Sequence, residues 1–132
     1  MHGEGAFRDL DFSLVDCTEL AKKYIARPDT HFFMLAEDEV KPVGFFMGYL
    51  TRYFFGPGRM ATELAWYVTP EKRGSMAGVR LLSAFRQWGK NKGAKEICVG
   101  VSTGTDLDRT EQLLKKSGFV KVGGIFKETV NV

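Results

Sequence analysis

The chain has 132 residues, 44% hydrophobic and 27% charged, which is enough apolar mass for one folded domain with its own core. Its net charge of +3, from 19 basic and 16 acidic residues, is too small to indicate nucleic-acid binding by itself. Two histidines exclude a His-rich metal site, and no apolar run approaches the ~20 residues of a membrane span.

The first predicted elements are a helix and a hairpin. Residues 1–12 show no period and are expected to be irregular, whereas apolar residues recur every three or four positions over 13–26 and predict a helix. Pro28 ends that helix. The apolar runs 31–36 and 43–53 flank an acidic turn, and this arrangement predicts an antiparallel hairpin.

The middle of the chain alternates strand and helix. A Phe-Gly-Pro-Gly turn at 55–58 precedes a third predicted strand at 61–68. Residues 70–75 form a loop, and an apolar stripe over 77–91 predicts the longest helix. A fourth strand is expected at 96–101, followed by a loop.

The last predicted elements are a helix at 107–116, capped by Gly118, and a strand at 119–126. Successive hairpin strands predict an antiparallel part, and the strand–helix–strand crossover over 61–101 predicts one parallel pair. We therefore expect a single domain over residues 1–132, of the α/β class, with a mixed, mainly antiparallel central sheet and helices on both faces.

The segment 67–79 joins a strand to a helix through a basic, glycine-containing loop. The first turn of a helix carries unpaired N–H groups and a partial positive charge, so it is suited to binding a phosphate. Small residues allow close backbone approach, and Arg73 adds a permanent charge. The alternative interpretation is an ordinary loop with a helix cap. The glycine spacing fits neither a Walker loop nor a dinucleotide fingerprint.

Two motifs resemble the GNAT family of N-acetyltransferases. The stretch from Val68 to Gly78 resembles the family's Arg/Gln-x-x-Gly-x-Gly/Ala motif, and residues 113–119 resemble its Leu-Tyr-x-x-x-Gly-Phe signature. Residues 100–104, with the Arg109-Thr110 pair, look like a phage-type subgroup. The resemblance covers residues 31–127, nearly the whole chain.

This resemblance implies acetyl-CoA as the cofactor, lying in a V-shaped splay between the strands at 61–68 and 96–101. It implies that the pantetheine arm contacts one strand backbone and that the pyrophosphate lies on the loop amides. The candidate cofactor-binding residues are Trp66, Tyr67, Val68, Arg73, Gly74, Ser75, Met76, Ala77, Gly78 and Arg109. The acetyl group would pass directly to a primary amine of a small molecule or a protein.

Glu63 is the candidate general base, since it precedes the cofactor loop and its position often has this role in the family that the chain resembles. The alternative for Glu63 is a solvent-facing strand residue, and Glu4 and His2 are weaker candidates for the base. The chain departs from the family pattern in two places. Met76 replaces the first glycine, and Leu114 replaces a tyrosine that is the usual general acid, a role that leucine cannot fill.

Other interpretations stay open. Leu114 motivates a CoA-binding module without catalysis, and the aromatic patch between Arg52 and Arg59 motivates a nucleic-acid- or partner-binding domain, although we expect neither nucleic acid nor membrane as a partner. That patch is expected to shape the acceptor pocket or to be a core or dimer contact. The family's first strand has no counterpart here, which makes a homodimer plausible. Cys17 and Cys98 lie far apart without the spacing of a metal site. We expect two reduced thiols in a cytoplasmic protein, with one disulfide as the alternative, and no signal peptide.

Overall fold

The computed structural model describes residues 13–39, 41–100 and 107–130. Two compact units are present, with the division after Gly100. The first unit contains α1 (Leu14–Ala26), β1 (His31–Asp38), β2 (Lys41–Arg52), β3 (Arg59–Val68), the short 3-10 helix η1 (Pro70–Lys72), α2 (Met76–Asn91) and β4 (Glu96–Cys98). The second unit contains α3 (Leu107–Lys116).

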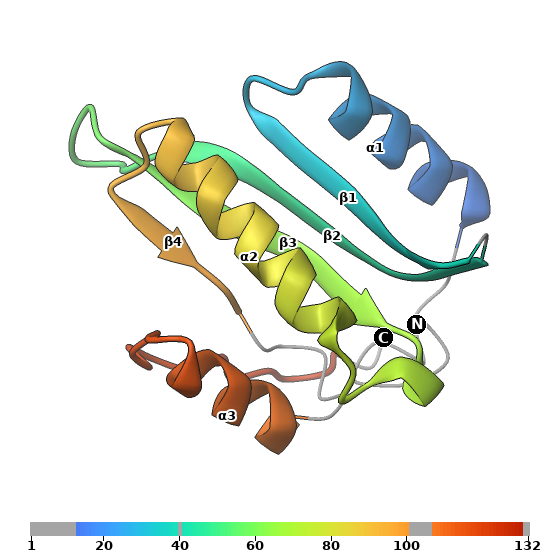
Figure 1. Cartoon of the computed structure of the whole chain (residues 1–132). Helices are drawn as coiled ribbons and strands as arrows, with labels where there is room; N and C mark the ends of the chain where they lie inside the picture. Colours follow the sequence, from blue (N-terminus) through green and yellow to red (C-terminus); the bar gives the residue numbers. More distant parts are fainter. Residues whose placement is uncertain (1–12, 40, 101–106, 131–132) are drawn as a thin grey trace. The chain divides into compact units, whose positions relative to one another are not determined.

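The first unit is built on a four-stranded sheet in the order β1-β2-β3-β4 (Figure 1). β1 with β2 and β2 with β3 are antiparallel, whereas β3 with β4 is parallel across α2. Neighbouring hairpin strands pair directly, and the parallel pair needs the helical crossover. The predicted α/β class and the mixed, mainly antiparallel sheet are therefore confirmed.

Helices lie on both faces of this sheet. The ring of Phe32 on β1 lies 5.4 Å from that of Phe85 and 5.5 Å from that of Trp88, both on α2. The preceding residue, His31, packs edge-on against Tyr24 of α1 with ring centroids 4.7 Å apart. Because successive strand side chains point to opposite faces, α1 and α2 cover opposite sides of the sheet, as expected from the sequence.

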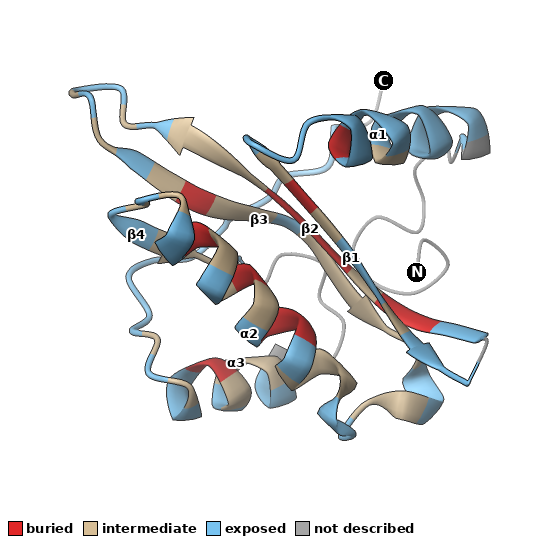
Figure 2. Cartoon of the chain, turned by 45° about the horizontal axis from the view of Figure 1, so that its top comes forward, coloured by how far each residue is buried: buried red, intermediate tan, exposed pale blue. Residues whose placement is uncertain are grey.

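The core lies between α2 and the sheet, and Figure 2 shows buried residues along the side of α2 that faces the strands. Phe46 and Phe85 are completely buried and stack with ring centroids 4.5 Å apart. Gly48 admits the Phe85 ring, since a Cβ at Gly48 would lie 2.3 Å from Phe85 Cε1. The aromatic residues of the hairpin strands thus fix α2 over the middle of the sheet.

Serine caps set the starts of α1 and α2 in the first unit. Ser13 Oγ accepts a hydrogen bond from Asp16 N at 3.2 Å, and Ser75 Oγ accepts one from Ala77 N at 3.3 Å. The observed helices begin within one residue of the predicted starts at 13 and 77. The second cap matters for function, because it fixes where the glycine-containing loop ends and α2 begins.

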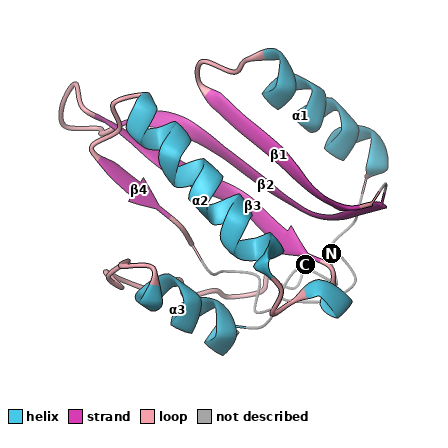
Figure 3. Ribbon diagram, in the orientation of Figure 1, coloured by secondary structure: helices cyan, strands magenta, loops and turns pink. Residues whose placement is uncertain are grey.

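Two strand predictions need correction. The segment 119–126 is not a strand, and the described residues after α3 are irregular (Figure 3). A strand needs a ladder partner, and this segment has none among the described residues. β4 is shorter than predicted, ending at Cys98. The expectations for residues 1–12 and 102–106, and for Val101, fall outside the described residues.

Candidate active site

The pairing of β3 with β4 stops halfway along β3. The ladder runs from Met60↔Glu96 to Thr62↔Cys98 and ends there, although β3 continues to Val68. On its other side β3 keeps pairing with β2 as far as Val68. Within the described residues, β3 therefore has an unpaired edge after Thr62, which is the arrangement that the predicted V-shaped splay requires.

A β-bulge lies at the same point on β3. Gly48 pairs with Glu63 and Met47 with Ala65, so Leu64 is an extra residue on β3. A bulge leaves one residue out of the ladder and redirects the neighbouring side chains, and bulges are frequent beside active sites. The continuous apolar run around Leu64 gave no signal for this bulge in the sequence.

Glu63 lies where the two strands separate. Its side chain is half-buried, and its Oε1 accepts a hydrogen bond from the backbone N–H of Gly100 at 3.1 Å. Burial disfavours the charged form and raises the pKa of Glu63 to about 7, while the Gly100 bond acts in the opposite direction. A carboxyl with this pKa both accepts and releases a proton near neutral pH. Gly100 as its partner was missed from the sequence, where it stood out only as part of a motif.

The loop before α2 uses some of its amides internally. Arg73 N donates to Pro70 O at 3.3 Å, Ser75 N donates to Lys72 O at 3.1 Å, and Ser75 Oγ caps Ala77 N. Among the described residues no acceptor takes the remaining amides of this segment, those of Gly74, Met76 and Gly78. Within the described part of the chain, half of the six candidate amides thus have no acceptor, and they lie at the end of the helix where an anion is stabilised.

Gly74 adopts a backbone conformation that favours glycine, with φ of 92°. It allows the chain to turn from η1 into the N-cap of α2. Gly78 is different, because a Cβ built there would meet Val68 Cγ2 at 3.6 Å and Trp66 Cζ2 at 3.7 Å, which are ordinary contacts. The protein itself does not require glycine at position 78 for space.

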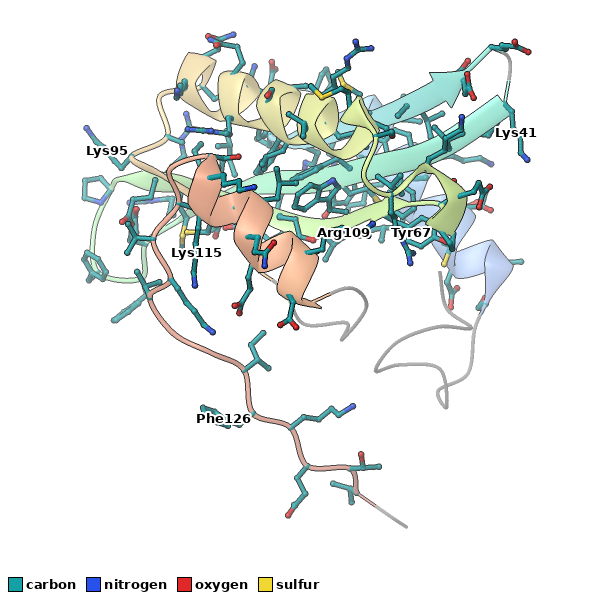
Figure 4. The ribbon with its side chains drawn as sticks, turned by 60° about the horizontal axis from the view of Figure 1, so that its bottom comes forward. Lys41, Tyr67, Lys95, Arg109, Lys115 and Phe126 are labelled. Carbon is teal, nitrogen blue, oxygen red and sulfur yellow. The ribbon has the colours of Figure 1, made fainter. Side chains whose placement is uncertain are left out.

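The end of β3 lies against this loop. Arg73 Nε donates to Val68 O at 2.9 Å, and the Arg73 guanidinium carbon is 5.2 Å from the centroid of the Tyr67 ring. Figure 4 labels Tyr67 at this end of β3. The structure therefore brings Trp66, Tyr67 and Val68 together with the loop from Arg73 to Gly78. The Val68 carbonyl oxygen already accepts the hydrogen bond from Arg73, so one of its two lone pairs is occupied.

Other residues that the sequence analysis considered for the site do not lie, among the described residues, beside Glu63 or the glycine-containing loop. Arg109 is exposed in the first turn of α3, in the second unit, so its expected role at the cofactor remains a prediction from the sequence. Arg52 and Arg59 pair across the β2–β3 turn, at the opposite end of β3 from Val68, about 30 Å away for ten strand residues. The aromatic turn is thus not beside the glycine-containing loop. His2 and Glu4 lie outside the described residues.

A sequence model of the Acetyltransferase (GNAT) family matches residues 6–119, so the chain belongs to this family of acetyltransferases. No curated protein sequence matches the chain. Two solved structures with the same fold are AAC(6')-Iy in complex with a bisubstrate analogue, CoA-S-monomethyl-acetylneamine, and glucosamine-6-phosphate N-acetyltransferase from Arabidopsis thaliana. The first is 14% identical, with a TM-score of 0.73 over 94% of this chain and 84% of that one. The second is 13% identical, with a TM-score of 0.74 over 92% and 82%.

A third structure, an aminoglycoside acetyltransferase from an uncultured soil metagenomic sample in complex with sisomicin, is 18% identical with a TM-score of 0.72 over 96% of this chain and 80% of that one. At these identities the structures establish the fold and not the substrate. None of the described helices is long and apolar enough to cross a membrane. The described residues also contain no cluster of three or more metal-ligating side chains.

Proposed function

We propose that the protein is an acetyl-CoA-dependent N-acetyltransferase that acts on a primary amine of a small molecule or protein, with Glu63 as general base. The observation that carries this proposal is the Glu63 carboxyl, whose pKa burial raises to about 7 at the point where β3 and β4 separate. An amine attacks only in its neutral form, so a base that is ionised at neutral pH is the group that such a reaction needs.

The residues of this chain fit the cofactor. The amides of Gly74, Met76 and Gly78 lie at the start of α2 without an acceptor among the described residues, and they are suited to the pyrophosphate. Arg73 adds positive charge beside them. The unpaired edge of β3 from Glu63 to Val68 offers backbone groups to the amide-containing pantetheine arm. When bound, acetyl-CoA supplies an acetyl thioester, which is the group to be transferred.

The residues proposed to act in catalysis, Glu63 and the backbone around Leu64, lie on β3. The Glu63 carboxylate would take one proton from the acceptor ammonium, which leaves a neutral nitrogen. That nitrogen would form the C–N bond as the C–S bond breaks, and the second proton that it then loses would go to the departing CoA thiolate, which leaves as the thiol. The bulge at Leu64 and the edge of β3 that has no ladder partner among the described residues after Thr62 are where backbone N–H groups would polarise the thioester carbonyl. Positioning of amine and thioester contributes a large part of the rate.

The test is release of free CoA thiol from acetyl-CoA in the presence of an amine panel. The panel contains aminoglycosides, glucosamine 6-phosphate and a lysine-containing peptide, because structural neighbours are named for the first two classes. We expect turnover on at least one amine, with an acidic limb near pH 7 that is absent in Glu63→Gln. Absence of turnover on every amine, or an unchanged pH profile in Glu63→Gln, contradicts the proposal.

A second candidate is a CoA-binding module without catalysis. Leu114, at the position where the resemblance expects a proton-donating tyrosine, is buried and apolar, so it supplies no proton to the leaving thiolate. This candidate predicts CoA binding without any acetylated product. Mass spectrometry of the amine panel after incubation distinguishes the two functions. The assignment to a phage-type subgroup remains part of the proposal.

A further inference from the structure

The indole of Trp66, on β3, lies beside the start of α2. A Cβ built at Gly78 would lie 3.7 Å from Trp66 Cζ2 and 3.9 Å from Trp66 Nε1, so the edge of the indole that carries the N–H borders the first turn of the helix. In Figure 1 the arrowhead of β3 and the first turn of α2 lie at the same end of the sheet. An indole N–H can only donate, so its partner must be an acceptor.

This N–H has no acceptor in the part of the chain that the structure describes. Trp66 is half-buried, and none of the hydrogen bonds between described residues involves its Nε1. The other tryptophan, Trp88, donates from its Nε1 to Pro28 O at 3.4 Å. A tryptophan N–H usually finds a hydrogen-bond partner as its ring becomes buried. The N–H of Trp66 therefore differs from that of Trp88 in being left for an acceptor from outside the described residues.

The Trp66 ring is held in place by the core. Its centroid lies 5.7 Å from that of the Phe46 ring on β2, and Phe46 is completely buried. Phe46 in turn stacks on Phe85 of α2. Packing thus fixes the indole relative to both the sheet and the helix. A donor that is already held in place loses little freedom when a ligand accepts its hydrogen bond.

The indole adds a side-chain donor to the amides at the same helix end. The amides of Gly74, Met76 and Gly78 have no acceptor among the described residues and lie at the positive end of α2. Gly78 is also the residue that the indole edge borders. A diphosphate carries several acceptor oxygens, so it can accept from a main-chain amide and from an indole N–H at once.

We propose that the Trp66 indole N–H binds the diphosphate of the cofactor, donating to a phosphate oxygen beside the Gly78 amide. This inference rests on the proposed function, since it requires acetyl-CoA at the start of α2. It gives the Trp66 side chain a role in addition to the one expected for the strand backbone. It also makes the protein prefer cofactors that carry a diphosphate over shorter pantetheine thioesters.

The first experiment follows the indole N–H itself, by NMR of the isotopically labelled wild-type chain. The chain has two tryptophans, and Trp88→Phe identifies which indole signal belongs to Trp66. We expect the Trp66 signal to move downfield on saturation with CoA or with ADP, which both carry a diphosphate, and to stay in place with pantetheine. The Trp88 signal should not move, because its N–H already donates to Pro28 O.

Calorimetry on the same samples separates this inference from the proposed function. If CoA binds and the Trp66 signal does not move, the indole has no part in binding, and the proposed function stands. A signal that follows pantetheine and not ADP would place the N–H on the pantetheine arm and overturn the inference as well. If CoA does not bind, the proposed function fails, and the role of Trp66 fails with it.

The second experiment compares Trp66→Phe with Trp88→Phe as the matched control. Phenylalanine keeps an aromatic ring against Phe46 but has no N–H, and thermal unfolding without ligand checks that the fold is kept. A hydrogen bond to a charged group corresponds to roughly 10- to 100-fold in affinity, so the dissociation constant of CoA should rise by about this factor in Trp66→Phe. The dissociation constant of pantetheine should not change, and Trp88→Phe should bind CoA like the wild type. An unchanged CoA affinity in Trp66→Phe, or an equal loss for pantetheine, would contradict a contact with the diphosphate.

Discussion

At the residue scale, the main physical feature is a carboxyl whose ionisation is opposed by its surroundings. The Glu63 carboxyl is half-buried and accepts a hydrogen bond from the Gly100 N–H. Burial raises its pKa from an ordinary 4.5 to about 7, against the opposing effect of that bond. Its role as a candidate base could be proposed from the sequence, because it lies on the strand that leads into the cofactor loop and its position often has this role in the family that the chain resembles. Its environment could not, because burial and the approach of Gly100 depend on where β3 and β4 separate.

The same pKa shift predicts a pH-dependent stability change. A raised carboxyl pKa means that the folded state holds its proton more tightly, so the stability that Glu63 contributes is full below about pH 4.5 and is lost as the pH rises to about 7. Glu63→Gln removes this loss. We expect the variant to be more stable than wild type by about 3 kcal/mol at pH 8 and equally stable at pH 4.

Urea denaturation at the two pH values measures this difference. Glu71→Gln, at an exposed position on η1, is the control and should show no such pH dependence. A Glu63→Gln variant whose stability relative to wild type is the same at both pH values would show that the carboxyl is not desolvated.

Gly78 tests the anion site without disturbing the fold. Since an added Cβ meets only ordinary contacts, Gly78→Ala should fold with wild-type stability. Gly78→Glu puts a bulky negative group beside the amides of the proposed anion site, and we expect CoA affinity to fall at least 100-fold. Titration calorimetry with CoA measures this, with Gly78→Ala as the matched control. Gly74 is a poorer choice, because its φ of 92° means that any side chain also strains the loop.

At the scale of the elements, helices and hairpins were predictable because they depend on local patterns. The cap at Ser75, the apolar stripe of α2 and the turn between β2 and β3 are all encoded over a few residues. The predicted strand at 119–126 was wrong for a related reason. Alternating apolar residues favour an extended chain, but a strand exists only where a ladder partner is present.

The packing of α2 on the sheet depends on a glycine that sequence analysis did not single out. A Cβ at Gly48 would lie 2.3 Å from Phe85 Cε1 and 2.9 Å from Thr62 O. Both distances are too short for a Cβ contact, so the buried ring or the strand backbone would have to move at a cost in stability. We expect Gly48→Ala to lower the free energy of unfolding by about 3 kcal/mol. Gly56→Ala, where an added Cβ has nothing within 4 Å, should change it by less than about 1 kcal/mol. Chemical denaturation of the pair checks the prediction, and equal stabilities would mean that the ring moves freely.

At the scale of the whole molecule, the fold follows from the order and pairing of elements more than from particular residues. Identities of 13–14% accompany TM-scores of 0.73–0.74 in the structural neighbours. A similar fold at such low identity is expected when the strands require only alternating apolar residues, with glycine where another group comes close to the backbone. The acceptor could not be predicted, because a shared fold does not fix the substrate and the neighbours are named for different amines.

Cofactor binding should be visible as stabilisation of the whole molecule. A ligand that binds only the folded state, present at 100 times its dissociation constant, adds about 2.7 kcal/mol to the free energy of unfolding. For a chain of this length, that corresponds to a rise in Tm of about 10 °C. We expect this rise with CoA, measured by differential scanning fluorimetry. The reason is that the amides of Gly74, Met76 and Gly78, which have no acceptor among the described residues, lie at the positive end of α2.

Pantetheine, which lacks the pyrophosphate, separates the two halves of the proposed site. It can contact the edge of β3 but offers no charge to the helix start, so the rise in Tm should be below about 2 °C at the same concentration. An equal rise with pantetheine would place the binding energy on β3 and remove the anion site from the loop. No rise with either compound would contradict cofactor binding altogether, whatever the outcome of the activity assay.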